Sequence, residues 1–114
     1  FHALILLDIF IAQQLYYLRV FDQTTDELIG HLVNITPEGI MIIREEPLET
    51  GGQFHLCMKL PVDIFGKEEL SFKAESVWCK RDVNPAFFDA GFKILELAWD
   101  DATVIKELID RFSS

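Results

Sequence analysis

The feature that most constrains the fold is a short polar turn between two apolar runs in the first half of the chain. The turn reads Asn34-Ile35-Thr36-Pro37-Glu38-Gly39. Thr36 and Pro37 favour turn initiation, Gly39 can supply a positive φ, and Asn34 can brace the turn through its side-chain amide. The pattern predicts two strands joined by a tight turn. It also places a polar pair, Asn34 and Thr36, at a fixed strand end where a ligand can reach it.

Six segments of the chain show the apolar runs or the alternation that are typical of strands. The clearest alternation is in residues 53–60, where Phe54, Leu56, Met58 and Leu60 are separated by mostly polar residues. The predicted strands cover residues 15–22, 27–35, 40–43, 53–60, 70–78 and 89–97. Six strands at this regular spacing predict a barrel or a sandwich.

The chain ends in a pattern typical of a helix. Asp100 or Asp101 can cap this helix at its start. Apolar side chains then recur along one helix face, at Val104, Ile105, Leu108, Ile109 and Phe112. Such a stripe must pack on other apolar groups, and an open end of the barrel is the expected partner.

The order of these segments resembles the PilZ domain family. The turn matches the family pattern [Asp/Asn]-x-[Ser/Thr]-x-x-Gly, and later segments resemble the family in the same order, at residues 46–51, 54–61, 74–79 and 90–94. The resemblance covers roughly residues 15–112. It implies a mainly β fold, a six-stranded antiparallel β-barrel with a C-terminal α-helix, over residues 15–114. It also implies a bacterial signalling module, since the best-known PilZ domains bind cyclic di-GMP.

The chain departs from the family in its arginines. Cyclic di-GMP receptors of the family resemble one another in an Arg-x-x-x-Arg motif before or at the first strand, whereas residues 8–15 contain no arginine. Guanidinium groups suit this ligand because they chelate phosphates and stack on bases. Arg19 is the only arginine ahead of the turn, and within a strand a solvated position is its more frequent role. We therefore expect weak or no nucleotide binding, unless arginines upstream of Phe1 complete the site.

The candidate ligand surface implied by the resemblance consists of Arg19, Asn34, Thr36, Gly39 and Trp78. Asn34 and Thr36 would meet a guanine edge, and Arg19 would meet a phosphate. Trp78 precedes a polar loop with two adjacent aromatic residues, so it can form a stacking platform for a base or a docking patch for a protein. A strand tryptophan more often fills a barrel core. Both interpretations of Trp78 stay open.

Composition narrows the function classes. The net charge of −9 over 114 residues opposes binding to nucleic-acid polymers and to anionic membranes. The three histidines are far apart, Cys57 and Cys79 lack metal-ligand spacing, and no catalytic motif is present. We therefore expect that the protein is not an enzyme and that it holds no metal and no cofactor. We also expect it to be cytoplasmic, with both thiols reduced.

The predicted function is a degenerate PilZ-like effector or adaptor that acts through a protein partner. One alternative is a functional cyclic di-GMP receptor. The other is an unrelated β-barrel that binds carbohydrate or acts as an enzyme.

The N-terminal segment, residues 1–14, is a separate feature. Ten of its first twelve residues are apolar, and Asp8 interrupts a run that is too short to span a membrane. It does not fit a signal peptide. An apolar run of this kind must be buried away from water, so we expect it to form an edge strand, a docked helix or an association surface. A homodimer formed through residues 1–12 competes with packing of the segment on its own barrel.

Overall fold

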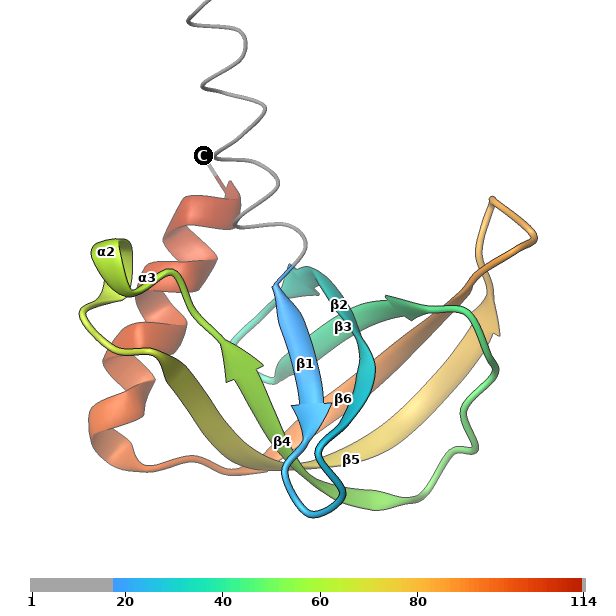
Figure 1. Cartoon of the computed structure of the whole chain (residues 1–114), viewed down its shortest axis with the longest axis horizontal. Helices are drawn as coiled ribbons and strands as arrows, with labels where there is room; N and C mark the ends of the chain where they lie inside the picture. The colour runs from blue at the N-terminus through green and yellow to red at the C-terminus, as the bar shows by residue number, and fades with distance from the viewer. Residues whose placement is uncertain (1–17, 114) are drawn as a thin grey trace, which may run out of the picture.

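The protein folds as a closed antiparallel barrel of six strands with a helix along one side (Figure 1). The structure, a computed structural model, describes residues 18–113. The strands are β1 (Arg19–Asp22), β2 (Glu27–Ile35), β3 (Gly39–Arg44), β4 (Gln53–Lys59), β5 (Glu69–Arg81) and β6 (Phe88–Glu96). Around the barrel their order is β1-β2-β3-β6-β5-β4, and β1 pairs with β4 to close it. The predicted barrel is confirmed. The predictions for residues 1–14 lie outside the described residues.

Apolar side chains from all six strands point inward and fill the barrel. The largest side chains that are fully buried there include Val20, Leu32, Ile42, Leu56, Met58 and Leu70. Because a six-stranded barrel is narrow, these side chains leave a packed core rather than a channel.

The long loop between β3 and β4 is fastened to β5 by a buried hydroxyl. Ser76 Oγ donates to the carbonyl of Glu49 at 2.8 Å and accepts from the backbone N–H of Gly52 at 3.2 Å. The backbone of Ser76 also bonds to Gly51 and Gly52. The loop is therefore held against the barrel although most of its side chains are exposed.

Two helices and one 3-10 turn complete the fold: α2 (Val62–Phe65), η1 (Trp99–Asp101) and α3 (Ala102–Ser113). Ile105 and Leu108 of α3 are buried in the same core as the strands, which confirms the predicted stripe. The helical run begins earlier than predicted, so Ala98, rather than an aspartate, is its N-cap residue. Asp101 instead accepts from Lys67 Nζ at 2.5 Å, and this ion pair ties η1 to the loop after α2.

The hairpin formed by β5 and β6 extends beyond the barrel on the side away from α3 (Figure 1). The 13 residues of β5 contain a β-bulge between Ser76 and Trp78. A bulge adds one residue to a strand and turns the following side chains to new directions. As a result Ser76 is buried, whereas Val77 and Trp78 are 45% and 37% exposed. Of the two interpretations of Trp78, the core position is therefore wrong, and the exposed position on the barrel surface holds.

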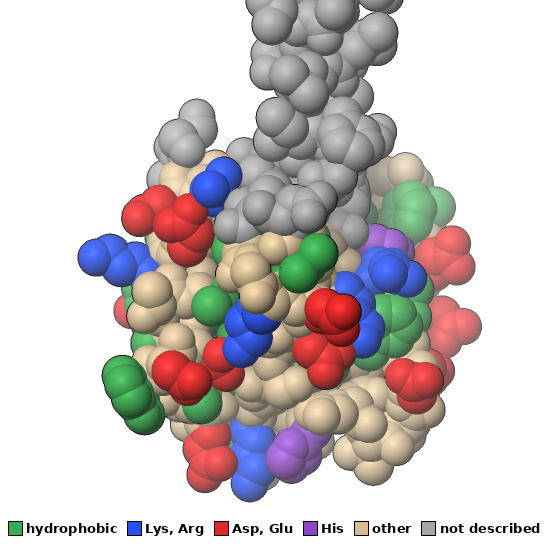
Figure 2. Space-filling view, turned by 60° about the vertical axis from the view of Figure 1, so that its left-hand side comes forward, with side chains coloured by type: hydrophobic (Ala, Val, Ile, Leu, Met, Phe, Trp, Pro, Cys, Tyr) green, Lys and Arg blue, Asp and Glu red, His purple; other side chains and the backbone are tan. Residues whose placement is uncertain are grey.

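Charges of both signs lie on the face of the molecule that Figure 2 draws. Figure 2 shows acidic and basic side chains interspersed over the described surface that faces the viewer, without a single basic field there. Within residues 18–113, no helix has the length and apolar character needed to cross a membrane.

Candidate functional site

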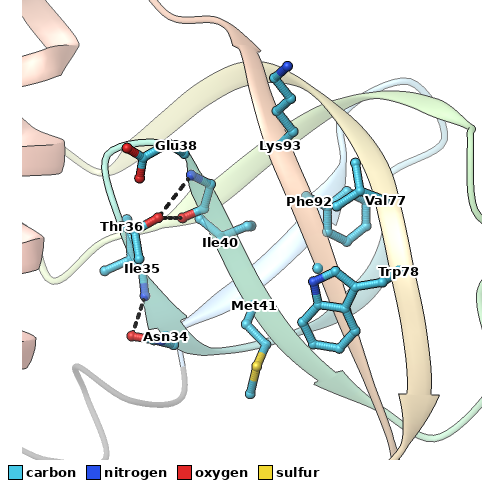
Figure 3. A pocket seen from close by; sticks show the side chains of 12 residues that line it. Asn34, Ile35, Thr36, Glu38, Ile40, Met41, Val77, Trp78, Phe92 and Lys93 are labelled. Carbon is cyan, nitrogen blue, oxygen red and sulfur yellow. Dashed lines mark hydrogen bonds between the residues drawn. The ribbon is translucent and has the colours of Figure 1, made fainter.

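An open pocket of about 320 Å³ lies beside the turn, on the outer surface of β3, β5 and β6 (Figure 3). It brings together four of the five predicted site residues, which are Asn34, Thr36, Gly39 and Trp78. In Figure 3 the turn residues lie on one side of β3 and Trp78 on the other, with Met41 between them. The pocket is therefore polar at the turn and apolar across β3 and β5.

Both polar side chains of the turn are engaged in bracing it. Asn34 Oδ1 accepts from the N–H of Ile35 at 2.9 Å. Thr36 Oγ1 accepts from the N–H of Gly39 at 3.3 Å, and the backbone N–H of Thr36 donates to the carbonyl of Gly39 at 2.9 Å. A ligand that needs these oxygen atoms would have to compete with the turn for them.

Gly39 is required for a reason that differs from the predicted one. The glycines with positive φ among the described residues are Gly51 and Gly66, so the expected positive φ at Gly39 is wrong. A Cβ at Gly39 would lie 2.0 Å from the carbonyl oxygen of Phe92. Glycine therefore lets the start of β3 approach the backbone of β6, where Gly39 pairs with Lys93.

Trp78 lies flat across β6 because its partner in the ladder is Gly91. A Cβ at Gly91 would lie 2.1 Å from Trp78 Nε1, so only glycine leaves room for the indole. On β5, the Nζ atom of Lys80 is 5.6 Å from the centroid of the Trp78 ring, within cation–π distance. The ring is thus fixed on the barrel surface while more than a third of the residue stays exposed.

The pocket carries little charge. Among the described residues that line it, the charged ones are Glu38 and Lys93, one of each sign, and none is an arginine. Arg19 lies on β1, which is separated from β3 by β2, and its guanidinium is 5.6 Å from the centroid of the Phe21 ring. Arg19 is therefore the one predicted site residue that the fold does not bring to this pocket.

Several lining residues were missed by sequence reasoning. Met41 and Lys93 belong to the pocket because they are outward positions of β3 and β6 next to the turn and Gly91. Their alternation was visible in the sequence. Their closeness to Trp78 depends on the register between strands that are distant in the chain, and the sequence carries no direct signal for that register.

The two cysteines make hydrogen bonds within the fold. Both cysteines are free thiols. Burial is the main cause that raises the pKa of Cys57. The Sγ of Cys57 donates a hydrogen bond to Glu69 Oε2 at 3.2 Å. Cys79 Sγ accepts from the N–H of Leu48 at 3.4 Å. In the part of the chain that the structure describes, no three His, Cys, Asp or Glu side chains gather as metal ligands.

Comparison with known proteins supports the fold alone. No protein-family model matches the sequence, and no curated protein matches it. Among solved structures, the inhibitor of motility MotI/DgrA of Bacillus subtilis is similar with a TM-score of 0.70 and 18% identity, over 85% of this chain and 46% of that chain. The PilZ domain of Escherichia coli YcgR with cyclic di-GMP is similar with a TM-score of 0.62 and 12% identity, over 85% and 81%. This chain thus spans less than half of MotI/DgrA, and its described residues have the PilZ-like fold.

Proposed function

We propose that this chain is a signalling module of the PilZ type that binds cyclic di-GMP weakly or not at all and acts by docking a protein at the pocket beside Trp78. The observation that carries the proposal is the chemistry of this pocket. Within residues 18–113, the pocket presents an aromatic and aliphatic surface with one lysine, one glutamate and no arginine. The module has no catalytic role in this proposal.

Weak nucleotide binding follows from the groups that a cyclic dinucleotide needs. Its phosphates favour guanidinium pairs. In the part of the pocket that the described residues form, Lys93 is the one cation, and Glu38 offsets its charge. A guanine edge would compete with the turn for Asn34 Oδ1 and Thr36 Oγ1. The net charge of −9 also opposes approach of an anionic ligand.

Protein docking follows from the exposed tryptophan. Val77 and Trp78 are neighbours on the outer face, and Gly91 keeps the indole flat, so a partner loses little conformational entropy in covering it. Tryptophan is among the residues that contribute most to protein interfaces. A volume of about 320 Å³ is at the lower end for small-molecule pockets and suits a large side chain of a partner.

Calorimetry with cyclic di-GMP at moderate salt tests the nucleotide part of the proposal. The expected dissociation constant is above about 1 μM, or weaker than about −8 kcal/mol, because the charge-assisted contacts are missing. A dissociation constant at or below that value would contradict the proposal.

Paired tryptophan variants test the docking part. Trp78→Ala removes the platform, whereas Trp99→Ala removes the other tryptophan, which is 88% exposed and outside the pocket. A protein recovered from a bacterial extract with the parent chain should be retained by Trp99→Ala and lost with Trp78→Ala. Equal recovery with both variants would place docking elsewhere.

A further inference from the structure

Two aspartates meet on the outer face of the hairpin that extends from the barrel. Asp89 lies on β6 opposite Lys80 of β5, and it is only 8% exposed. Asp82 follows Lys80 by two residues, so it is a diagonal neighbour of Asp89 on the same face. A side-chain hydrogen bond between the two carboxyl groups contributes to the shift of each pKa, downward for Asp82 and upward for Asp89. Ionising both carboxyl groups would bring two negative charges together, and this repulsion favours a pair that holds one proton.

A backbone hydrogen bond at the hairpin tip stabilises the negative charge on Asp82 rather than on Asp89. The backbone N–H of Asn84 donates to Asp82 Oδ2 at 3.0 Å, and the backbone N–H of Asp82 donates to the carbonyl of Phe87 at 3.0 Å. The Asn84 N–H lowers the pKa of Asp82, whereas burial, followed by the contact with Asp82, raises the pKa of Asp89. Asp89 is therefore the group that takes up the proton.

Lys80 connects this pair to the candidate site. It faces Asp89 across the β5–β6 ladder, and its Nζ is also 5.6 Å from the centroid of the Trp78 ring. From β3, the residue opposite Asp89 is Ile43, which carries no charge. Arg44 and Arg81 lie opposite Phe88 and so on the other face of the sheet. Lys80 is thus the cation that balances the pair.

We propose that the Asp82–Asp89 pair is a proton-binding switch that sets the position of Lys80 and hence the charge beside Trp78. With Asp89 protonated, its O–H donates to the Asp82 carboxylate, the pair carries one negative charge, and Lys80 rests over the indole. Loss of that proton to solvent doubles the charge of the pair. Lys80 is then drawn toward the carboxylates and away from Trp78, and their repulsion loosens the tip at Phe87.

The switch itself does not depend on the proposed function, whereas its effect on a partner rests on docking at Trp78. Carboxyl ¹³C and amide NMR titrations of the whole chain, without nucleotide or partner, test it directly. The pKa of Asp89 should lie above the ordinary value of an aspartate. The indole N–H of Trp78 and the amide of Phe87 should shift with the same midpoint.

Substitutions separate the switch from general pH effects. Asp89→Asn should abolish the pH-dependent change in the chemical shifts of Trp78 and Phe87. Asp100→Asn, at an exposed position outside the pair, should leave that change as it is in the parent. If Asp89→Asn does not fold, Asp82→Asn should lower the Asp89 midpoint toward the ordinary range. The proposal is overturned if Asp89 titrates as an ordinary aspartate, or if Trp78 does not follow it. Neither result bears on the nucleotide affinity or on partner recovery.

Discussion

Truncation of Leu108 is the most direct test of how α3 is held on the barrel. Leu108 is fully buried and belongs to the same core as the strand residues. Replacing a buried leucine by alanine typically costs about 2.7–5 kcal/mol, because transfer free energy is lost and a cavity remains. For a domain of about 100 residues, each kcal/mol lowers the melting temperature by roughly 4 °C or more. Leu108→Ala should therefore melt about 10 °C or more below the parent.

The matched control is Lys106→Ala in the same helix. Lys106 is exposed, and lysine and leucine have nearly the same helix propensity relative to alanine, so intrinsic propensity contributes little to the difference. The control should stay within about 0.5 kcal/mol of the parent. Thermal melts followed by circular dichroism measure both variants. If Leu108→Ala melts within about 2 °C of the parent, which corresponds to roughly 0.5 kcal/mol, α3 does not pack on the barrel as described.

Four further outcomes are expected. Gly91→Ala should push the Trp78 indole outward, because the new Cβ would lie 2.1 Å from Nε1. The tryptophan fluorescence emission should then shift to longer wavelength. Unchanged emission would contradict the position of the indole flat against β6. Ser76→Ala should cost about 1–3 kcal/mol in denaturant unfolding, since it removes the two hydrogen bonds of this hydroxyl to Glu49 and Gly52, each contributing about 0.5–1.5 kcal/mol. Because folding raises the pKa of Asp89, its stabilising contribution is present below the unfolded pKa and is lost as pH rises through the folded pKa. Asp89→Asn should therefore reduce the change of melting temperature with pH in the acidic range. If the variant shows the same pH dependence as the parent, this linkage is refuted. Light scattering should find a dimer that becomes monomeric without residues 1–12, and a monomeric parent would exclude that interface.

The strands and the last helix were predictable because each depends on local pattern. The alternation of Leu56 and Met58 with their neighbours predicted β4, and the spacing of Ile105 and Leu108 predicted α3. The turn was also predictable, since Asn34 bonds within its own segment. These features need only residues that are close in the chain.

The site was only partly predictable because it depends on register. Trp78 continues an apolar alternation in the sequence, and the bulge that turns it outward leaves no signal in that alternation. The requirement for Gly39 comes from the carbonyl of Phe92, in a strand far along the chain. Asp89 became notable only when the hairpin placed it beside Asp82. Arg19 was a candidate by type alone, and the strand order keeps it away from the pocket.

The order of strands around the barrel has a consequence for folding. β1, β2 and β3 form one meander of neighbouring hairpins, and β4, β5 and β6 form a second. The barrel closes along two seams, β3 with β6 and β1 with β4, which join residues far apart in the chain. Local hairpins form quickly, whereas distant strands must overcome loop-closure entropy before they pair. Each meander is thus a unit of local contacts, and the loop at residues 45–50, which joins the two, is the point at which the chain divides into two complementary halves.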